Sequence, residues 1–308
     1  MTAVNTYTGP TTIDAGSTLA LSGSGSIAQS SGVANSGTFD ISATTNGATV
    51  QALSGSGAVA LGAQSLTVSN ASGSFSGSIA GTGGLNITGG SQTLSGNNAY
   101  TGATSIASGA TLTLSGSGSI AQSSGVTNSG TFNIAGKTGN VNVASYNQTS
   151  TGNLAMNFSP SNTQKLLASG TASLAGGLNL TASSGAYQSG KYALLSASGV
   201  TGIFGSLSTN LSSYTTLGYA LAYDASNVYL LFTPNAADTQ QSLVSTASAL
   251  QSTYTLQNSV LANSFSYDCT EFGANNICLS VGGRNTAVSA ANGLNLSLIH
   301  ISEPTRPY

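Results

Sequence analysis

The chain has 308 residues, of which 4% are charged, and its formal net charge at pH 7 is −2. Globular domains usually contain about 25% charged residues, so this composition argues against an ordinary soluble enzyme. Five Lys and Arg residues cannot neutralise a phosphate backbone, which excludes nucleic acid as a partner. Hydrophobic residues make up 39% of the chain and recur at ordered spacings, so a disordered Gly/Ser linker is excluded as well.

The N-terminal residues give no export signal. Residues 2–10 are polar, and no run of about 20 apolar residues, the length of a transmembrane helix, occurs in the chain. We therefore expect either that the protein is not exported or that its true N-terminus is missing here. The repeats described next favour the second interpretation.

A long internal repeat occupies much of the first half of the chain. Residues 7–41 recur as residues 100–134, an offset of 93 residues, and eight of the 35 paired positions differ. The differences fall largely at polar or small positions. The recurring apolar residues are Leu19, Leu21, Ile27, Val33, Phe39 and Ile41 in the first copy and Leu112, Leu114, Ile120, Val126, Phe132 and Ile134 in the second. This pattern predicts a repeated unit with one buried face.

Short runs that alternate apolar and small polar residues predict the local structure of residues 1–139. Examples are residues 18–21, 38–41, 66–68 and 111–114, which are bounded by Gly, Asn or Ser, residues suited to tight corners. Strands this short form no useful hairpin core, but in a coil each can pair with the next turn at a spacing of about 4.8 Å. We therefore predict an all-β fold, a parallel β-helix (solenoid), in preference to a flat β-sandwich.

Residues 140–235 have larger side chains and no exact repeats. Seven of the twelve tyrosines lie between Tyr146 and Tyr229, and residues 154–158, 192–194 and 228–232 are predicted strands. A stack of rungs must hide its open end, as the terminal units of repeat proteins do. We therefore predict that residues 140–235 form a C-terminal cap.

Three shorter segments follow. Residues 236–265 place apolar side chains three and four residues apart, which predicts one amphipathic α-helix. Residues 266–295 contain an alternating run at 276–284, typical of an incomplete membrane β-barrel strand. Residues 296–308 resemble the translation of a sequencing-library adapter, so we exclude them, and with them His300, from fold reasoning.

The order of these segments resembles that of autotransporters, which Gram-negative bacteria secrete by the type V route. Residues 75–114 resemble the passenger-associated β-strand repeat, and residues 146–204 resemble the autochaperone region. The helix after Asp238 is similar to the linker that threads the barrel pore, and residues 269–284 are similar to the start of the barrel. The resemblance implies a right-handed β-helix, exposed at the cell surface and anchored in the outer membrane in the full-length parent.

No catalytic, cofactor-binding or metal-binding residues are predicted. The only acids before the cap are Asp14 and Asp40, and the second copy of the repeat has Ala107 and Asn133 in their places. Calcium sites need clustered Asp and glycosidases need paired carboxylates, so we interpret these two as solvated turn residues. Residues 23–26 lack the Lys and the helix of a phosphate loop, and we interpret them as a corner.

Cys269 and Cys278 are the only thiols, and both lie in the segment similar to the barrel start. The export that the resemblance implies would expose them to an oxidising periplasm. A disulfide is therefore favoured over a metal site, which needs four ligands, and two unpaired cysteines are the alternative.

The leading functional hypothesis is a non-catalytic surface passenger, either a structural stalk or an adhesin that supports adherence, aggregation or biofilm formation. Its expected partners are the surface of a host or neighbouring cell, a second copy of itself, and its own β-barrel in the full-length parent. The alternative is a stalk whose enzymatic domain lies upstream of Met1. An amyloid-like matrix protein is a third hypothesis, disfavoured because such a protein lacks a distinct cap and a pore-type helix.

Overall fold

The computed structural model describes residues 1–161, 164–264, 283–289 and 295–301. For residues 236–239, 259–264, 283–289 and 295–301 the backbone alone is described. The chain divides into two units, Met1–Thr233 and Pro234–Tyr308, and each is described by itself.

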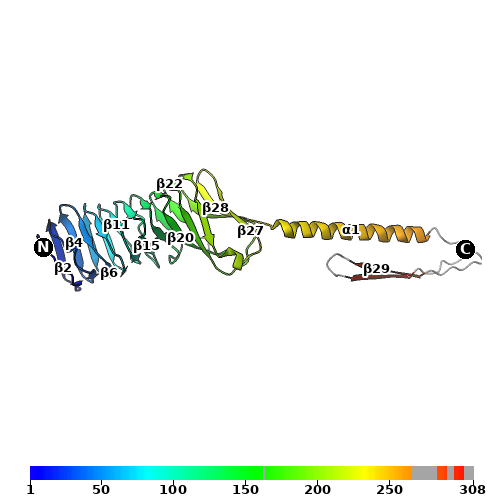
Figure 1. Ribbon diagram of the computed structural model, residues 1–308, viewed down its shortest axis with the longest axis horizontal. Coiled ribbons are helices and arrows are strands. Elements are labelled where there is room, and N and C mark those ends of the chain that lie inside the picture. The colour runs from blue at the N-terminus through cyan, green and yellow to red at the C-terminus, as the bar shows by residue number, and fades with distance from the viewer. Residues whose placement is uncertain (162–163, 265–282, 290–294, 302–308) are drawn as a thin grey trace, which may run out of the picture. The chain divides into compact units, whose positions relative to one another are not determined.

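The first unit is a coil of stacked β-strands with three sides (Figure 1). One side is a ten-stranded parallel sheet of β1 (Thr11–Ile13), β3 (Val33–Asn35), β6 (Leu53–Gly55), β9 (Ser74–Phe75), β12 (Ser91–Leu94), β15 (Thr111–Leu114), β17 (Thr131–Asn133), β20 (Asn153–Phe158), β23 (Gly177–Ala182) and β26 (Ser206–Thr209). The second side is an eight-stranded sheet of β5 (Ala48–Val50), β8 (Leu66–Val68), β11 (Leu85–Ile87), β14 (Thr104–Ile106), β16 (Val126–Asn128), β19 (Tyr146–Gln148), β22 (Thr171–Leu174) and β25 (Gly199–Gly202).

The third side holds two five-stranded sheets, one after the other along the coil. The first consists of β2 (Thr18–Gly23), β4 (Thr38–Thr44), β7 (Ala58–Gly62), β10 (Ser78–Gly81) and β13 (Ala99–Tyr100). The second consists of β18 (Val141–Val143), β21 (Leu166–Ala168), β24 (Gly190–Ser196), β27 (Gly218–Tyr223) and β28 (Asn227–Thr233). The chain visits the three sides in the same cyclic order, so the predicted parallel β-helix is confirmed.

Alternation along each strand builds the interior. Leu19, Phe39, Val59 and Ile79 are aligned partners on β2, β4, β7 and β10, and each of the last three is at most 1% exposed. Burying such side chains contributes roughly 1.5–3 kcal/mol each. The apolar positions of the repeat are therefore core positions, as predicted.

Leu19 is the exception, because it is only partly buried whereas its counterpart Leu112 is fully buried. The reason is position in the stack. β2 is the end strand of its sheet and pairs with β4 alone, whereas β15 is covered by β12 on one side and β17 on the other.

The two copies of the long repeat lie on different sides of the coil. β1 and β3 belong to the ten-stranded sheet, but their counterparts β14 and β16 belong to the eight-stranded sheet. Likewise β2 and β4 belong to a five-stranded sheet, and their counterparts β15 and β17 to the ten-stranded one. The offset of 93 residues is therefore not a whole number of turns. The three sides use the same short strands and corners, so one sequence fits any of them.

Residues 22–32 and 115–125 are identical in sequence, and we call each a break segment. Neither contains a named strand beyond the end of β2 at Gly23. The first precedes the start of the eight-stranded sheet at β5, and the second separates the two five-stranded sheets. Ile27 and Ile120 fill the interior in both, at 0% and 1% exposure, so a break segment interrupts a ladder without opening the core.

The C-terminal end of the coil is closed by antiparallel strands. β24 pairs with β28 and β28 with β27, all antiparallel, whereas the earlier strands of the coil pair in parallel. Phe158, Tyr187, Tyr192 and Phe232 form an aromatic cluster here, with ring centroids 5.5–6.1 Å apart. The earlier rungs also bury aromatic side chains, because Phe39, Phe75, Tyr100 and Phe132 are all fully buried.

The second unit contains the helix α1 (Ala236–Ser264) and a hairpin of β29 (Gly283–Ser289) and β30 (Asn295–Ile301). Leu243, Leu250 and Tyr254 of α1 are each 65–67% exposed. β30 includes residues 296–301, which we excluded as adapter-like, and these residues pair with β29 in antiparallel register. Among the described residues, no helix is both long and apolar enough to cross a lipid bilayer.

Candidate contact surface

A ladder of uncharged side chains follows the outside of the ten-stranded sheet. Asn153, Gly177 and Ser206 are aligned partners on β20, β23 and β26. Two residues further along, Ala155, Asn179 and Ser208 are aligned in the same way. Asn179, Ser206 and Ser208 are exposed, because alternate residues of each strand point away from the core.

Gly177 leaves a groove in this ladder, because it has no side chain. A Cβ atom at Gly177 would lie 3.1 Å from Asn153 Oδ1 and 3.2 Å from Ser206 Oγ, so any other residue would fill the space between these side chains. The resulting groove has a volume of about 620 Å³ and is open to solvent. Its lining residues are Ser150, Thr151, Gly152, Asn153, Gly176, Gly177, Leu178, Asn179, Gly205, Ser206 and Ser208. All are uncharged, so the groove offers amide and hydroxyl groups that suit a neutral hydrogen-bonding ligand.

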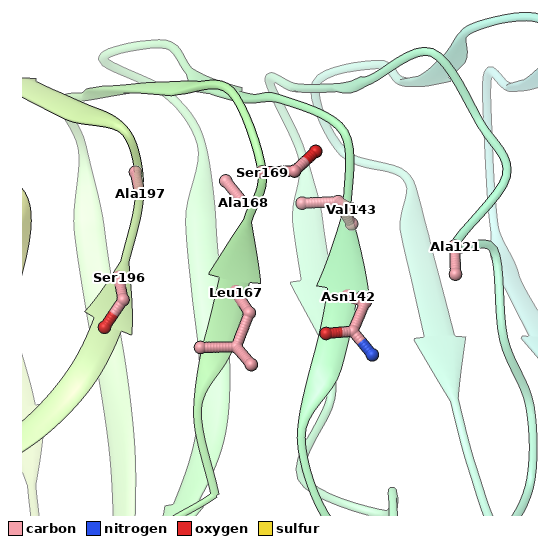
Figure 2. Close-up of a pocket in the computed structure, with 8 residues that line it drawn as sticks. All are labelled: Ala121, Asn142, Val143, Leu167, Ala168, Ser169, Ser196 and Ala197. Carbon is pink, nitrogen blue, oxygen red and sulfur yellow. The ribbon is translucent and has the colours of Figure 1, made fainter.

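A second groove, of about 450 Å³, lies beside the break segment 115–125 (Figure 2). Asn142, Leu167 and Ser196 occupy matching positions on β18, β21 and β24, and Ala121 of the break segment lines the far side. β18 is the end strand of its sheet because the break segment has no strand to pair with it. The groove follows from that interruption and again contains no ionisable side chain.

The clearest electrostatic feature is the turn between β27 and β28. The Asp224 carboxylate accepts hydrogen bonds from the N–H groups of Ser226 (2.8 Å) and Asn227 (2.7 Å) and from the Tyr229 hydroxyl (2.8 Å). The Ser226 bond, followed by the Tyr229 bond, holds the pKa of this carboxyl below its usual value. Lys191 Nζ lies 5.6 Å from the centroid of the Tyr229 ring. These contacts fix the hairpin turn, and both oxygens of the Asp224 carboxylate accept hydrogen bonds within it.

The two acids that the sequence analysis considered do not form a pair. Asp14 lies in the turn between β1 and β2, whereas Asp40 lies on β4 with its carboxylate 2.9 Å from the Ser42 N–H. Asp14 lies outside β2, the strand that pairs with the β4 strand of Asp40, and no hydrogen bond between the two residues occurs in the described part of the chain. Residues 23–26 form a corner, in which Gly23 has φ 56° and the Gly25 N–H donates to the Ser22 carbonyl (2.9 Å).

Cys269 and Cys278 lie outside the described residues, so the disulfide stays a prediction, as does most of the predicted barrel segment. Among the side chains that the structure describes, no group of three or more His, Cys, Asp or Glu is placed to hold a metal ion.

The fold defines the chain as a parallel β-solenoid protein. Comparisons with protein-family models, with curated proteins and with solved structures give no match. The grooves were missed by the sequence analysis. For the first groove the signal was the glycine pair 176–177 at the start of β23, because a glycine in such a place marks close approach of a neighbour or a ligand.

Proposed function

We propose that the chain is a non-catalytic passenger of the autotransporter type, a surface stalk that contacts its partners through its uncharged outer face. The observation that carries this proposal is the ten-stranded parallel sheet, which continues from β1 to β26 without interruption. A continuous ladder of this kind makes each rung contact only its neighbours, which suits an extended stalk.

The outer face supports the adhesive part of the proposal. A surface of Ser, Thr and Asn side chains has no charge to steer a partner over long distances. Contact then depends on many short hydrogen bonds that repeat along the rod. The surface of a host or neighbouring cell, with its neutral sugars, is the candidate partner, and a second copy of the protein is the other.

Labelling of intact cells tests the location. Antibodies raised against the purified chain should label cells that produce the protein without permeabilisation, and added protease should remove the label. Labelling that requires lysis of the cells would contradict a surface passenger.

Bead adhesion tests the function. Beads coated with the chain should bind cells more strongly than albumin-coated beads. Gly177→Ala, which fills the groove between Asn153 and Ser206, should weaken this binding. Gly199→Ala is the matched control, because its new Cβ meets only Thr171 Cγ2 at 3.9 Å. Equal binding by chain-coated and albumin-coated beads would contradict the adhesive role, and substrate turnover by the purified chain would contradict the non-catalytic one.

A further inference from the structure

Asn46 and Gly47 lie in the corner between β4 and β5 and form one of two Asn-Gly pairs in the chain. The other pair, residues 292–293, lies outside the described residues. An asparagine followed by glycine loses its side-chain amide most readily, because glycine has no side chain to hinder attack by its own backbone nitrogen. In a folded protein this reaction further depends on whether hydrogen bonds hold the amide and the nitrogen.

Both reacting groups are free at this corner. The Asn46 side chain is exposed, and neither this side chain nor the Gly47 N–H has a hydrogen-bond partner among the described residues. The backbone is anchored one residue to either side, because the N–H groups of Thr45 and Ala48 donate to carbonyls of neighbouring rungs, at 2.9 and 3.1 Å. The corner is therefore held at its ends, and its two middle residues are unbonded.

A position just beyond the second copy of the repeat provides a comparison. At the same offset of 93 residues, positions 139–140 read Gly-Asn where positions 46–47 read Asn-Gly. Asn140 is exposed too, but its Oδ1 accepts a hydrogen bond from the Lys165 N–H (3.1 Å). The next N–H, that of Val141, donates to the Lys165 carbonyl (2.9 Å). Both groups that would react are therefore engaged at this position.

Asn70 separates the two requirements. Its side chain is exposed and has no hydrogen-bond partner among the described residues, as at Asn46. The following N–H, that of Ala71, donates to the Gly89 carbonyl (2.9 Å). Asn70 therefore has a free side-chain amide next to a bonded backbone nitrogen.

We propose that Asn46 is a site of spontaneous deamidation in the folded protein. The Gly47 backbone nitrogen attacks the Asn46 side-chain carbonyl carbon and forms a new C–N bond. The bond from that carbon to the amide nitrogen breaks, and the amide leaves as ammonia with the proton of the Gly47 nitrogen. Solvent water then opens the cyclic succinimide at either of its carbonyls, which gives aspartate or isoaspartate at residue 46.

The two products have different effects on the corner. Aspartate adds a negative charge at an exposed position, whereas isoaspartate also lengthens the main chain by routing it through the Cβ atom of residue 46. The corner has little room for this change, because a Cβ atom at Gly47 would lie 2.3 Å from the Ser65 carbonyl oxygen. β5 is an end strand that pairs with β8 alone. Isoaspartate should therefore weaken the bond at the start of this pairing, from the Ala48 N–H to the Ser65 carbonyl.

Incubation of the whole chain at mildly alkaline pH tests the proposal, with a parallel sample unfolded in urea. Peptide mass spectrometry measures deamidation at each asparagine, and the ratio of the folded to the unfolded rate removes the effect of local sequence. This ratio should lie within about threefold of one at Asn46 and should be lower by about tenfold or more at Asn70 and Asn140, where hydrogen bonds protect the site. Absence of product at residue 46 in the folded chain, whether or not the unfolded chain reacts, would overturn the proposal.

Two variants complete the experiment. Asn46→Gln should give no product at this position, because its longer side chain closes a larger ring much more slowly. Asn46→Asp reproduces the aspartate product and should keep the wild-type melting temperature and the wild-type hydrogen exchange at Ala48. The isoaspartate fraction, separated by chromatography, should exchange the Ala48 amide faster by on the order of tenfold. Wild-type exchange at Ala48 in that fraction would overturn the predicted effect on β5.

Discussion

Tyr7 and Tyr100 hold the same place in the repeated sequence and make the same hydrogen bond, to Thr11 Oγ1 and Thr104 Oγ1 respectively, at 2.7 Å. In both copies the threonine hydroxyl is in turn bonded to a serine hydroxyl, Ser30 or Ser123. The two tyrosines differ in exposure, because Tyr7 is 38% exposed and Tyr100 is fully buried. Burial raises the pKa of the Tyr100 hydroxyl above its usual value of 10.0, and that of Tyr146 likewise, against the lowering effect of their hydrogen bonds.

These two pKa shifts predict a loss of stability at alkaline pH. Above about pH 10 the unfolded chain releases the tyrosine protons while the folded chain retains them, so the free energy of unfolding falls as pH rises. Below that pH the stabilisation is fully present. Tyr100→Phe should lower stability at neutral pH by about 1 kcal/mol, through loss of the Thr104 bond. It should also reduce the further loss at high pH.

Urea unfolding at about pH 8 and about pH 11 measures both effects. Tyr7→Phe is the matched variant at neutral pH, because it removes the same bond at an exposed site and should cost less. If the free energy of unfolding of Tyr100→Phe fell with pH as steeply as that of wild type, Tyr100 would not be a source of the alkaline loss of stability.

Glycines at the corners allow the close approach of successive rungs. Gly102→Ala should destabilise the coil by about 1–3 kcal/mol, because its new Cβ would collide with the backbone of Gly83. Gly9→Ala is the counterpart in the first copy, preceded by the same Tyr-Thr pair but followed by Pro10 where Gly102 is followed by Ala103. Its new Cβ meets nothing within 4 Å, so it should stay within roughly 0.5 kcal/mol of wild type. Urea unfolding of the two variants measures the difference. If both variants were destabilised equally, the need for glycine at position 102 would come from backbone conformation and not from contact with the neighbouring rung.

At the scale of elements, the break segments and the antiparallel hairpin set where ladders begin and end. A break segment replaces one strand on one side while Ile27 or Ile120 keeps the interior filled. The β27–β28 hairpin ends the third side by reversing strand direction. A break segment therefore leaves an end strand beside it, such as β18, whereas the hairpin ends its sheet with antiparallel pairing.

The hairpin should respond to acid through Asp224. Because hydrogen bonds lower its pKa in the folded state, the carboxylate stabilises the turn above the usual carboxyl pKa, and this contribution is lost as pH falls through the folded-state value. Protection factors of the Ser226 and Asn227 amides should therefore fall at acid pH. Asp224→Asn, which has no titrating group, should remove this dependence. Persistence of the dependence in the variant would assign it to another group.

At the scale of the whole molecule, the first unit has one open end and one closed end. Stability in a stacked repeat is local, so rungs next to an open end exchange one neighbour for water. The sequence suggested that large side chains are concentrated in residues 140–235. Fully buried aromatic side chains occur in residues 1–139 as well, so this difference between the two parts is small. We therefore expect the C-terminal end to be the more stable one, because antiparallel strands close it and the aromatic cluster around Phe158 and Phe232 packs there.

In denaturant, the N-terminal rungs should melt before residues 140–235. Limited proteolysis in increasing urea should leave a resistant fragment that begins near residue 140. Deletion of residues 1–92 should leave the cap folded, and deletion of residues 146–232 should leave residues 1–139 slow to fold. Resistance of the N-terminal rungs with early cleavage of the cap would contradict this order.

The sequence by itself determined the class of fold. Alternation in runs of three to five residues, with glycine and serine at the corners, leaves few structures that bury every second side chain. For that reason the core positions, Val33, Phe39 and Ile41 among them, were predictable from the repeat.

Only the tertiary structure decided which side of the coil each copy occupies, because that depends on the summed length of all intervening corners. The same holds for Tyr7 and Leu19, which lie in the repeated segment and whose counterparts Tyr100 and Leu112 are fully buried. Their exposure depends on whether a rung lies beneath them, and local sequence carries no record of that. The groove at Gly177 likewise exists only because Asn153 and Ser206, 24 residues before it and 29 after it, become its neighbours.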